Sequence, residues 1–204
     1  MNLKRSYTLL APAYDAFIES ASHSLRRRSL GALQAQRPMR VLLAGVGTGL
    51  DLPLLPPQHR YVGVDLTAAM LRRIGRRQTG LDFQAVQGDV HRLPFAAASF
   101  DAAVLHLILA VVPEPLLCLA ESARVVASGG QILVLDKFLR PGQRAPLRRA
   151  LNVLSRRVAT RLDVVFEDVL AAVPGLRLAS DEPALAGGWF RLIRLEKTMS
   201  GSQR

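Results

Sequence analysis

The sequence predicts an α/β fold in which a mostly parallel sheet is covered by helices on both faces. Short, nearly continuous apolar runs alternate along the chain with longer segments of helical periodicity. Strands that are apolar at successive positions are typical of parallel sheets buried on both sides. The predicted strands are Arg40–Ala44, Tyr61–Asp65, Asp82–Gln87, Phe100–His106, Gln131–Lys137, Leu176–Glu182 and Trp189–Lys197.

The predicted helices lie between these strands and before the first of them. They cover Thr67–Arg77, Glu114–Val126 and Ala145–Val158, and residues 1–38 are also predicted to be helical, with a break at Pro12. The last two strands should form an antiparallel pair around Ala186-Gly187-Gly188. We therefore expect an N-terminal helical segment over residues 1–38, one domain over 39–197 and a disordered tail over 198–204.

The composition excludes several classes of protein. Half of the 204 residues are hydrophobic, which suits one globular domain, but no run is long enough for a transmembrane helix. The N-terminus lacks a signal-peptide pattern, so we expect a cytoplasmic protein. Cys118 is the only cysteine, and the four histidines show no metal-ligand spacing, so no metal site is expected. The net charge of +11, mostly from arginine, indicates attraction to anionic membranes, nucleic acid or acidic metabolites.

A glycine-rich loop follows the first predicted strand directly. The segment Gly45-Val-Gly-Thr-Gly49 lets the backbone turn tightly and approach a ligand without interference from side chains. Asp65 ends the second strand, twenty residues after Gly45. At this spacing a carboxylate can accept hydrogen bonds from both hydroxyls of a ribose. The pair therefore predicts a site for an adenosine-containing ligand.

A dinucleotide-dependent dehydrogenase would show the same glycine loop and the same carboxylate. Its usual third glycine or alanine would fall at position 50, where this chain has Leu50. Pro53, Pro56 and Pro57 also disturb the helix start that would hold a pyrophosphate. Both features argue against a dehydrogenase.

The third and fourth strands carry further polar groups at their ends. Gly88-Asp89-Val90 ends the third strand, and Ser99-Phe100-Asp101 opens a fourth that ends at His106. The Asp89 carboxylate can accept a hydrogen bond from the exocyclic amine of adenine, with Val90 and Met70 on either side of the ring. Four strand ends thus bring polar groups to the edge where parallel sheets bind ligands.

From Tyr7 to Lys197, this succession of motifs resembles the class I S-adenosylmethionine-dependent methyltransferases. The resemblance implies a Rossmann-like three-layer sandwich with seven strands in the order 3-2-1-4-5-7-6, strand 7 being antiparallel, and an N-terminal helical lid. It also implies S-adenosyl-L-methionine as the methyl donor. The donor-binding residues it implies are Tyr14, Gly45, Val46, Gly47, Gly49, Asp65, Leu66, Met70, Asp89, Val90 and His106.

One position departs from the family pattern. The family usually has an acidic residue two positions before the first glycine, where it helps to hold the amino group of the donor, but this chain has Leu43. Three interpretations follow: another carboxylate such as Asp51 substitutes, donor binding is weaker, or the chain is a donor-binding protein that has lost catalysis.

The N-terminal segment bears on the methyl acceptor. Lys4-Arg-Ser-Tyr7, Ala11-Pro12-Ala-Tyr14-Asp15 and Arg26-Arg27-Arg28 resemble bacterial phospholipid N-methyltransferases and, more loosely, the C-methyltransferases of ubiquinone and menaquinone synthesis. Val111-Val-Pro-Glu-Pro115 is closer to the phospholipid group. The resemblance implies a lid that places Tyr14 near the methionine end of the donor, and phosphatidylethanolamine as the acceptor.

His106 and Tyr14 are the predicted catalytic residues. His106 ends the fourth strand, beside the expected sulfonium, where it can receive a proton from an amine acceptor or help to ionise a ring hydroxyl.

Basic residues favour a membrane-facing acceptor. Between Arg144 and Arg161, apolar residues at helical spacing leave much of the circumference to arginine, as in helices that lie on anionic lipid. The same pattern also suits a helix packed on the sheet. We therefore expect a small-molecule or lipid acceptor and a peripheral position at the inner face of the membrane. A nucleic-acid acceptor is not favoured, because the segment after the fourth strand lacks the Asn/Asp-Pro-Pro-aromatic motif of base-amine methylation.

Overall fold

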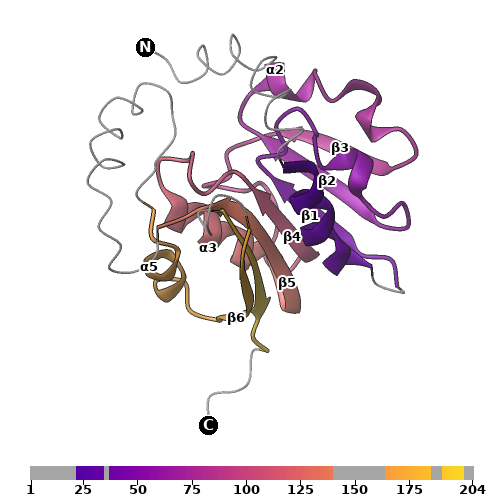
Figure 1. Ribbon diagram of the computed structural model, residues 1–204. Helices are drawn as coiled ribbons and strands as arrows, with labels where there is room; N and C mark the ends of the chain where they lie inside the picture. The colour runs from indigo at the N-terminus through magenta and orange to yellow at the C-terminus, as the bar shows by residue number, and fades with distance from the viewer. Residues whose placement is uncertain (1–21, 35–36, 140–163, 185–189, 200–204) are drawn as a thin grey trace, which may run out of the picture.

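The computed structural model describes residues 22–34, 37–139, 164–184 and 190–199 (Figure 1). Within these ranges the chain forms a seven-stranded sheet in the order β3-β2-β1-β4-β5-β7-β6. The strands are β1 (Arg40–Ala44), β2 (Arg60–Asp65), β3 (Asp82–Gln87), β4 (Phe100–His106), β5 (Val126–Lys137), β6 (Leu176–Pro183) and β7 (Phe190–Lys197).

The pairing of the strands confirms the predicted topology. β3, β2, β1, β4 and β5 are parallel to one another, and β7 runs antiparallel between β5 and β6. The parallel strands all point their carboxyl ends at one edge of the sheet, and that edge carries the polar residues singled out in the sequence.

The central strands β1 and β4 are buried on both faces. Neighbouring residues of a strand point to opposite sides, so they belong to two different cores. On one face Leu42 and Leu105 belong to a core with the helices α3 (Pro115–Val125) and α5 (Phe166–Ala171). On the other face Leu43 and Val104 pack with Leu30 and the short 3₁₀ helix η1 (Gly31–Leu33). A helix over residues 22–30 leads into η1, so this part of the predicted N-terminal lid is helical and lies against the sheet.

Two predicted elements have different lengths in the structure. The prediction of one helix over Thr67–Arg77 is wrong: α2 covers only Ala68–Leu71, and a separate 3₁₀ helix, η3, covers Gly75–Gln78. Gly75, the first residue of η3, has a φ of 50°, a left-handed conformation that one continuous α-helix over these residues cannot contain. β5 begins at Val126, five residues before the predicted start, because Val126 pairs with Phe100 across an irregularity in the β4–β5 ladder.

Several predictions fall outside the described residues: Tyr14, the helix over Ala145–Val158, the turn at Ala186-Gly187-Gly188 and residues 200–204. In the part of the chain that the structure describes, no helix has both the length and the apolar character needed to cross a bilayer.

The β4–β5 irregularity gives a test of the fold. A Cβ added at Gly130 would lie 2.5 Å from the carbonyl oxygen of Asp101 and 2.9 Å from that of Ala127, whereas nothing lies within 4 Å of a Cβ added at Gly31. We expect Gly130→Ala to lower the free energy of unfolding by about 1–3 kcal/mol in urea titrations, because backbone must move to accommodate the methyl group. Gly31→Ala is the matched control and should change it by less than about 0.5 kcal/mol; equal effects of the two would contradict the packing described.

Candidate functional site

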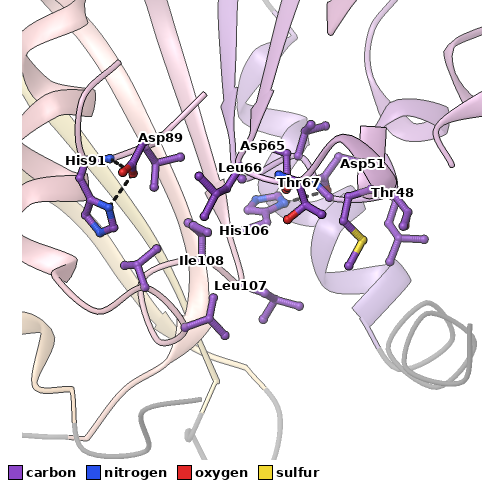
Figure 2. Close-up of a pocket in the computed structure, with 18 of the residues that line it drawn as sticks. Thr48, Asp51, Asp65, Leu66, Thr67, Asp89, His91, His106, Leu107 and Ile108 are labelled. Carbon is purple, nitrogen blue, oxygen red and sulfur yellow. Dashed lines mark hydrogen bonds and ion pairs between the residues drawn. The ribbon is translucent and has the colours of Figure 1, made fainter. Parts of the chain in front are cut away.

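A pocket lies at the carboxyl edge of the sheet, over the ends of β1 to β4 (Figure 2). The loops that leave these strands line it, together with Arg26 from helix 22–30 and the apolar segment after β4. The structure brings most of the predicted site residues to this pocket: Gly45, Val46, Gly47, Asp65, Leu66, Met70, Asp89, Val90 and His106 all line it.

The glycine loop forms the floor of the pocket. Gly45, Gly47 and Gly49 have φ values of 70°, 57° and 81°, which side-chain-bearing residues rarely adopt. A Cβ at Gly47 would meet nothing within 4 Å, so the backbone there stands open to a ligand. Gly49 does not line the pocket, and a Cβ there would lie 2.8 Å from Leu52, so its requirement is one of packing.

Asp65 is fixed at the end of β2 by two backbone donors. The N–H of Gly47 donates to Oδ2 and the N–H of Thr67 donates to Oδ1, each at 2.9 Å. Burial raises the pKa of Asp65 above its ordinary value, although the two N–H groups lower it in part. The glycine loop and the carboxylate therefore hold each other in place.

Asp89 lies at the end of β3 and is held by the residue two positions later. The backbone N–H of His91 donates to its Oδ1 at 2.9 Å, and Nδ1 of His91 lies 2.6 Å from the same oxygen. These hydrogen bonds, the backbone one first, lower the pKa of Asp89, so the carboxylate is ionised at neutral pH. His91 also lines the pocket.

A buried polar network occupies the other end of the pocket. Oδ1 of Asp51 accepts a hydrogen bond from Nη1 of Arg26 at 2.8 Å and lies 2.8 Å from Nδ1 of His106. Nε2 of His106 lies 2.9 Å from the hydroxyl of Ser29, and Nε of Arg26 donates to the hydroxyl of Ser22. The network thus joins helix 22–30 to the glycine loop and to the end of β4.

The charges of this network compensate one another. Burial by itself raises the pKa of Asp51, but His106 and Arg26 lower it by more, so the net pKa lies well below the ordinary value. Because Asp51 is ionised, Nδ1 of His106 carries a proton and donates it to the Asp51 carboxylate. Figure 2 shows His106 and Asp51 joined in this way.

Sequence reasoning missed Arg26 and Ser29 as residues of the site. They lie three positions apart, so they share one face of a helix, but only the fold shows that this face meets Asp51 and His106. Leu43, the departure from the family pattern, does not line the pocket: its side chain is buried in the core beside Leu30.

An apolar wall closes the pocket beside His106. It is formed by the segment after β4, namely Leu107, Ile108, Val111, Val112 and Pro113. The fully buried Asp136 at the end of β5 holds this segment, because one of its carboxylate oxygens accepts the N–H of Ala110 at 3.0 Å. Burial raises the pKa of Asp136 to about 6.

Comparison with known proteins agrees with this geometry. A family profile described as a methyltransferase domain matches residues 42–134. The chain is 33% identical to a phosphatidylethanolamine N-methyltransferase of Cereibacter sphaeroides over 96% of its length and 97% of that enzyme. It belongs to the class I S-adenosylmethionine-dependent methyltransferases.

Two further comparisons define the range of this similarity. The methyltransferase is 35% identical to a demethylmenaquinone methyltransferase of Renibacterium salmoninarum, over 62% of its own length and 55% of that enzyme. A methyltransferase of Haloferax volcanii, solved in complex with the activator Trm112, superposes with a TM-score of 0.75 at 15% identity, covering 95% of this chain and 96% of the other. That likeness establishes the fold.

Asp136 makes the stability of the methyltransferase depend on pH. Its pKa is about 6 in the folded chain and about 3.8 when unfolded, so the folded state binds the proton more tightly and loses stability as the pH rises from about 4 to about 6. Asp136→Asn cannot ionise. Its stability relative to the wild type should therefore increase over this interval, by up to on the order of 3 kcal/mol, in urea titrations at stepped pH. A constant difference across these pH values would contradict this origin of the pKa shift.

Proposed function

We propose that this methyltransferase transfers a methyl group from S-adenosyl-L-methionine to the amine of phosphatidylethanolamine or a closely similar lipid. The observation that carries the proposal is the similarity to the Cereibacter enzyme, which extends over nearly the whole of both chains. The apolar wall beside His106 supports it, because a lipid-like acceptor needs an apolar lining close to the reacting amine.

The charge of the pocket supports a cationic donor. Among the described residues, Asp51, Asp65 and Asp89 line it against one guanidinium, that of Arg26, although the whole chain carries a net charge of +11. A sulfonium is attracted to such a site, whereas the pyrophosphate of a dinucleotide is repelled. Asp65 is suited to accept from the ribose hydroxyls and Asp89 from the adenine amine, with Leu66, Met70 and Val90 against the ring and Gly45 to Gly49 below the chain of the donor.

When bound, the donor supplies a methyl group already activated by the positive sulfur. The protein must then align the acceptor and remove one proton from its amine. We assign this proton to Nε2 of His106, the ring nitrogen with the free electron pair while Asp51 fixes the proton on Nδ1. When Nε2 takes up this proton, it no longer accepts a hydrogen bond from the hydroxyl of Ser29. Tyr14, in the N-terminal lid of residues 1–38, is assigned to the methionine end of the donor and lies outside the described residues.

We further propose that the enzyme works as a peripheral protein on the membrane surface. Leu66 at the pocket and Leu116 and Leu117 at the start of α3 are exposed, with 38% of Leu116 and 49% of Leu117 accessible to solvent. Leu116 and Leu117 follow Pro113 of the apolar wall in the sequence. The net positive charge supports attraction to anionic headgroups.

A quinone-type carbon acceptor is the second candidate, because the chain is also similar to demethylmenaquinone methyltransferases. The first test therefore supplies labelled donor with phosphatidylethanolamine vesicles, a demethylquinol in detergent, or RNA. We expect label in the phospholipid amine. Label only in the quinol would support the second candidate, and label only in RNA would overturn both lipid-like assignments.

Asp65 should be needed for turnover. We expect Asp65→Asn to lower kcat/KM for the donor by at least about tenfold, because the amide leaves one hydrogen-bond acceptor where the ionised carboxylate has two. The matched control is Asp82→Asn, at the exposed start of β3 beside Arg60, which should leave the rate within about twofold. An equal loss in both variants would contradict the assignment of Asp65.

The exposed leucines give a test of membrane binding. We expect the double variant Leu116→Ser, Leu117→Ser to bind vesicles of phosphatidylethanolamine and phosphatidylglycerol at least about threefold more weakly in sedimentation assays, because less apolar surface enters the interface. Leu178→Ser, an equally exposed position on β6 with 44% of the residue accessible, is the control and should bind as the wild type does. Binding that does not weaken with salt, or that is unaffected by the double variant, would contradict the proposed surface.

A further inference from the structure

Positive charge gathers on the segment that runs from β2 to β3. Residues 66–81 include Arg72, Arg73, Arg76 and Arg77 but no aspartate or glutamate. Arg72, Arg73 and Arg76 are exposed, and none of the three forms an ion pair within the part of the chain that the structure describes. We refer to these three as the α2–η3 arginines. Like charges so close together repel one another, so the surface that they form favours an anionic partner.

This segment is fixed beside the glycine loop, at the rim of the pocket. Thr67 and Met70 at its start line the pocket, and Figure 2 shows Thr67 there. Ile74 is buried in the core below the loop, and Nη1 of Arg77 donates to the carbonyl oxygen of Thr48 at 2.9 Å. Because Ile74 and Arg77 hold the segment against the loop, the α2–η3 arginines are presented to solvent next to the pocket.

Exposed arginines at the opposite edge of the sheet are paired with carboxylates. The amino ends of β1, β2 and β6 lie at that edge, because β6 is antiparallel to β7 and therefore runs in the same direction as β5. The ion pairs there are Arg37–Asp101, Arg60–Asp82 and Arg177–Glu196. The two edges thus differ in charge: these three guanidiniums are each compensated, whereas the α2–η3 arginines beside the pocket are not.

We propose that the α2–η3 arginines bind the phosphate groups of anionic phospholipids and so hold the rim of the pocket against the membrane. The inference rests on the proposed function, in which the acceptor is a lipid. Leu66 belongs to the same segment and is 45% exposed, so an apolar side chain can enter the interface while the guanidiniums contact phosphates. A nucleic acid fits this surface less well, because residues 66–81 contain no aromatic side chain on which a base could stack.

The test compares two triple variants that lose the same charge. One replaces Arg72, Arg73 and Arg76 with glutamine, and the other replaces Arg37, Arg60 and Arg177. The second is the matched control, since exposed ion pairs contribute little to stability. Sedimentation of the full chain with vesicles of phosphatidylethanolamine and phosphatidylglycerol measures binding at about 0.1 M salt. We expect the first variant to bind at least about tenfold more weakly, with a shallower dependence on salt, and the control to bind within about twofold of the wild type.

Equal losses in the two variants would show that total charge and not this surface determines binding, and would overturn the inference. Unchanged binding by the first variant would overturn it as well. Replacing the same three arginines with lysine keeps the charge and should bind within about threefold of the wild type, which shows that the surface still folds. A first variant that loses affinity for single-stranded RNA in fluorescence anisotropy, but keeps its affinity for vesicles, would assign the surface to nucleic acid instead.

Failure of the proposed function is distinguishable from failure of this inference. Vesicle binding requires no methyl transfer, so the two triple variants can be compared whichever acceptor the enzyme uses. A tenfold loss confined to the first variant would support the surface even if label enters only a quinol, and that labelling would contradict phosphatidylethanolamine as the acceptor.

Discussion

Parallel hydrogen bonding of β3, β2, β1 and β4 forces the carboxyl ends of four strands onto one edge of the sheet. Asp65 and Asp89 are 24 residues apart in the sequence, yet this constraint brings both to one pocket. Each carboxylate is then held by backbone N–H groups from the loop that follows its own strand or a neighbouring strand. Because these donors belong to the fold, the ligand meets acceptors that are already oriented.

The buried network around Asp51 depends on the same edge. His106 reaches it from β4 and Asp51 from the glycine loop, while Arg26 and Ser29 come from a helix that packs on the opposite side of the strands from α3. Each side chain of the network forms a hydrogen bond with another, and these bonds stabilise the ionised carboxylate of Asp51 in its buried position. The same network attaches helix 22–30 to the glycine loop and to the end of β4.

The apolar half of the pocket depends on Asp136 of β5. The segment after β4 contains Leu107, whose φ of 58° is unusual for a leucine, and it is held by backbone hydrogen bonding to Asp136. Such a conformation persists only where its surroundings fix it. The buried Asp136 carboxylate therefore holds in place the wall on which we place the lipid acceptor.

The sequence by itself determined the strands, the order implied by the family resemblance, the glycine loop and the carboxylates at the strand ends, because these depend on local periodicity and on residues next to a strand. It misjudged the helix after β2, since Gly75 adopts a left-handed conformation that periodicity does not register. Only the tertiary structure decided that Leu43 belongs to the core and that Arg26, Ser29, Asp51 and His106 form one network. These contacts join residues up to 77 positions apart, and the packing of a helix on the sheet, which no local pattern specifies, brings them together.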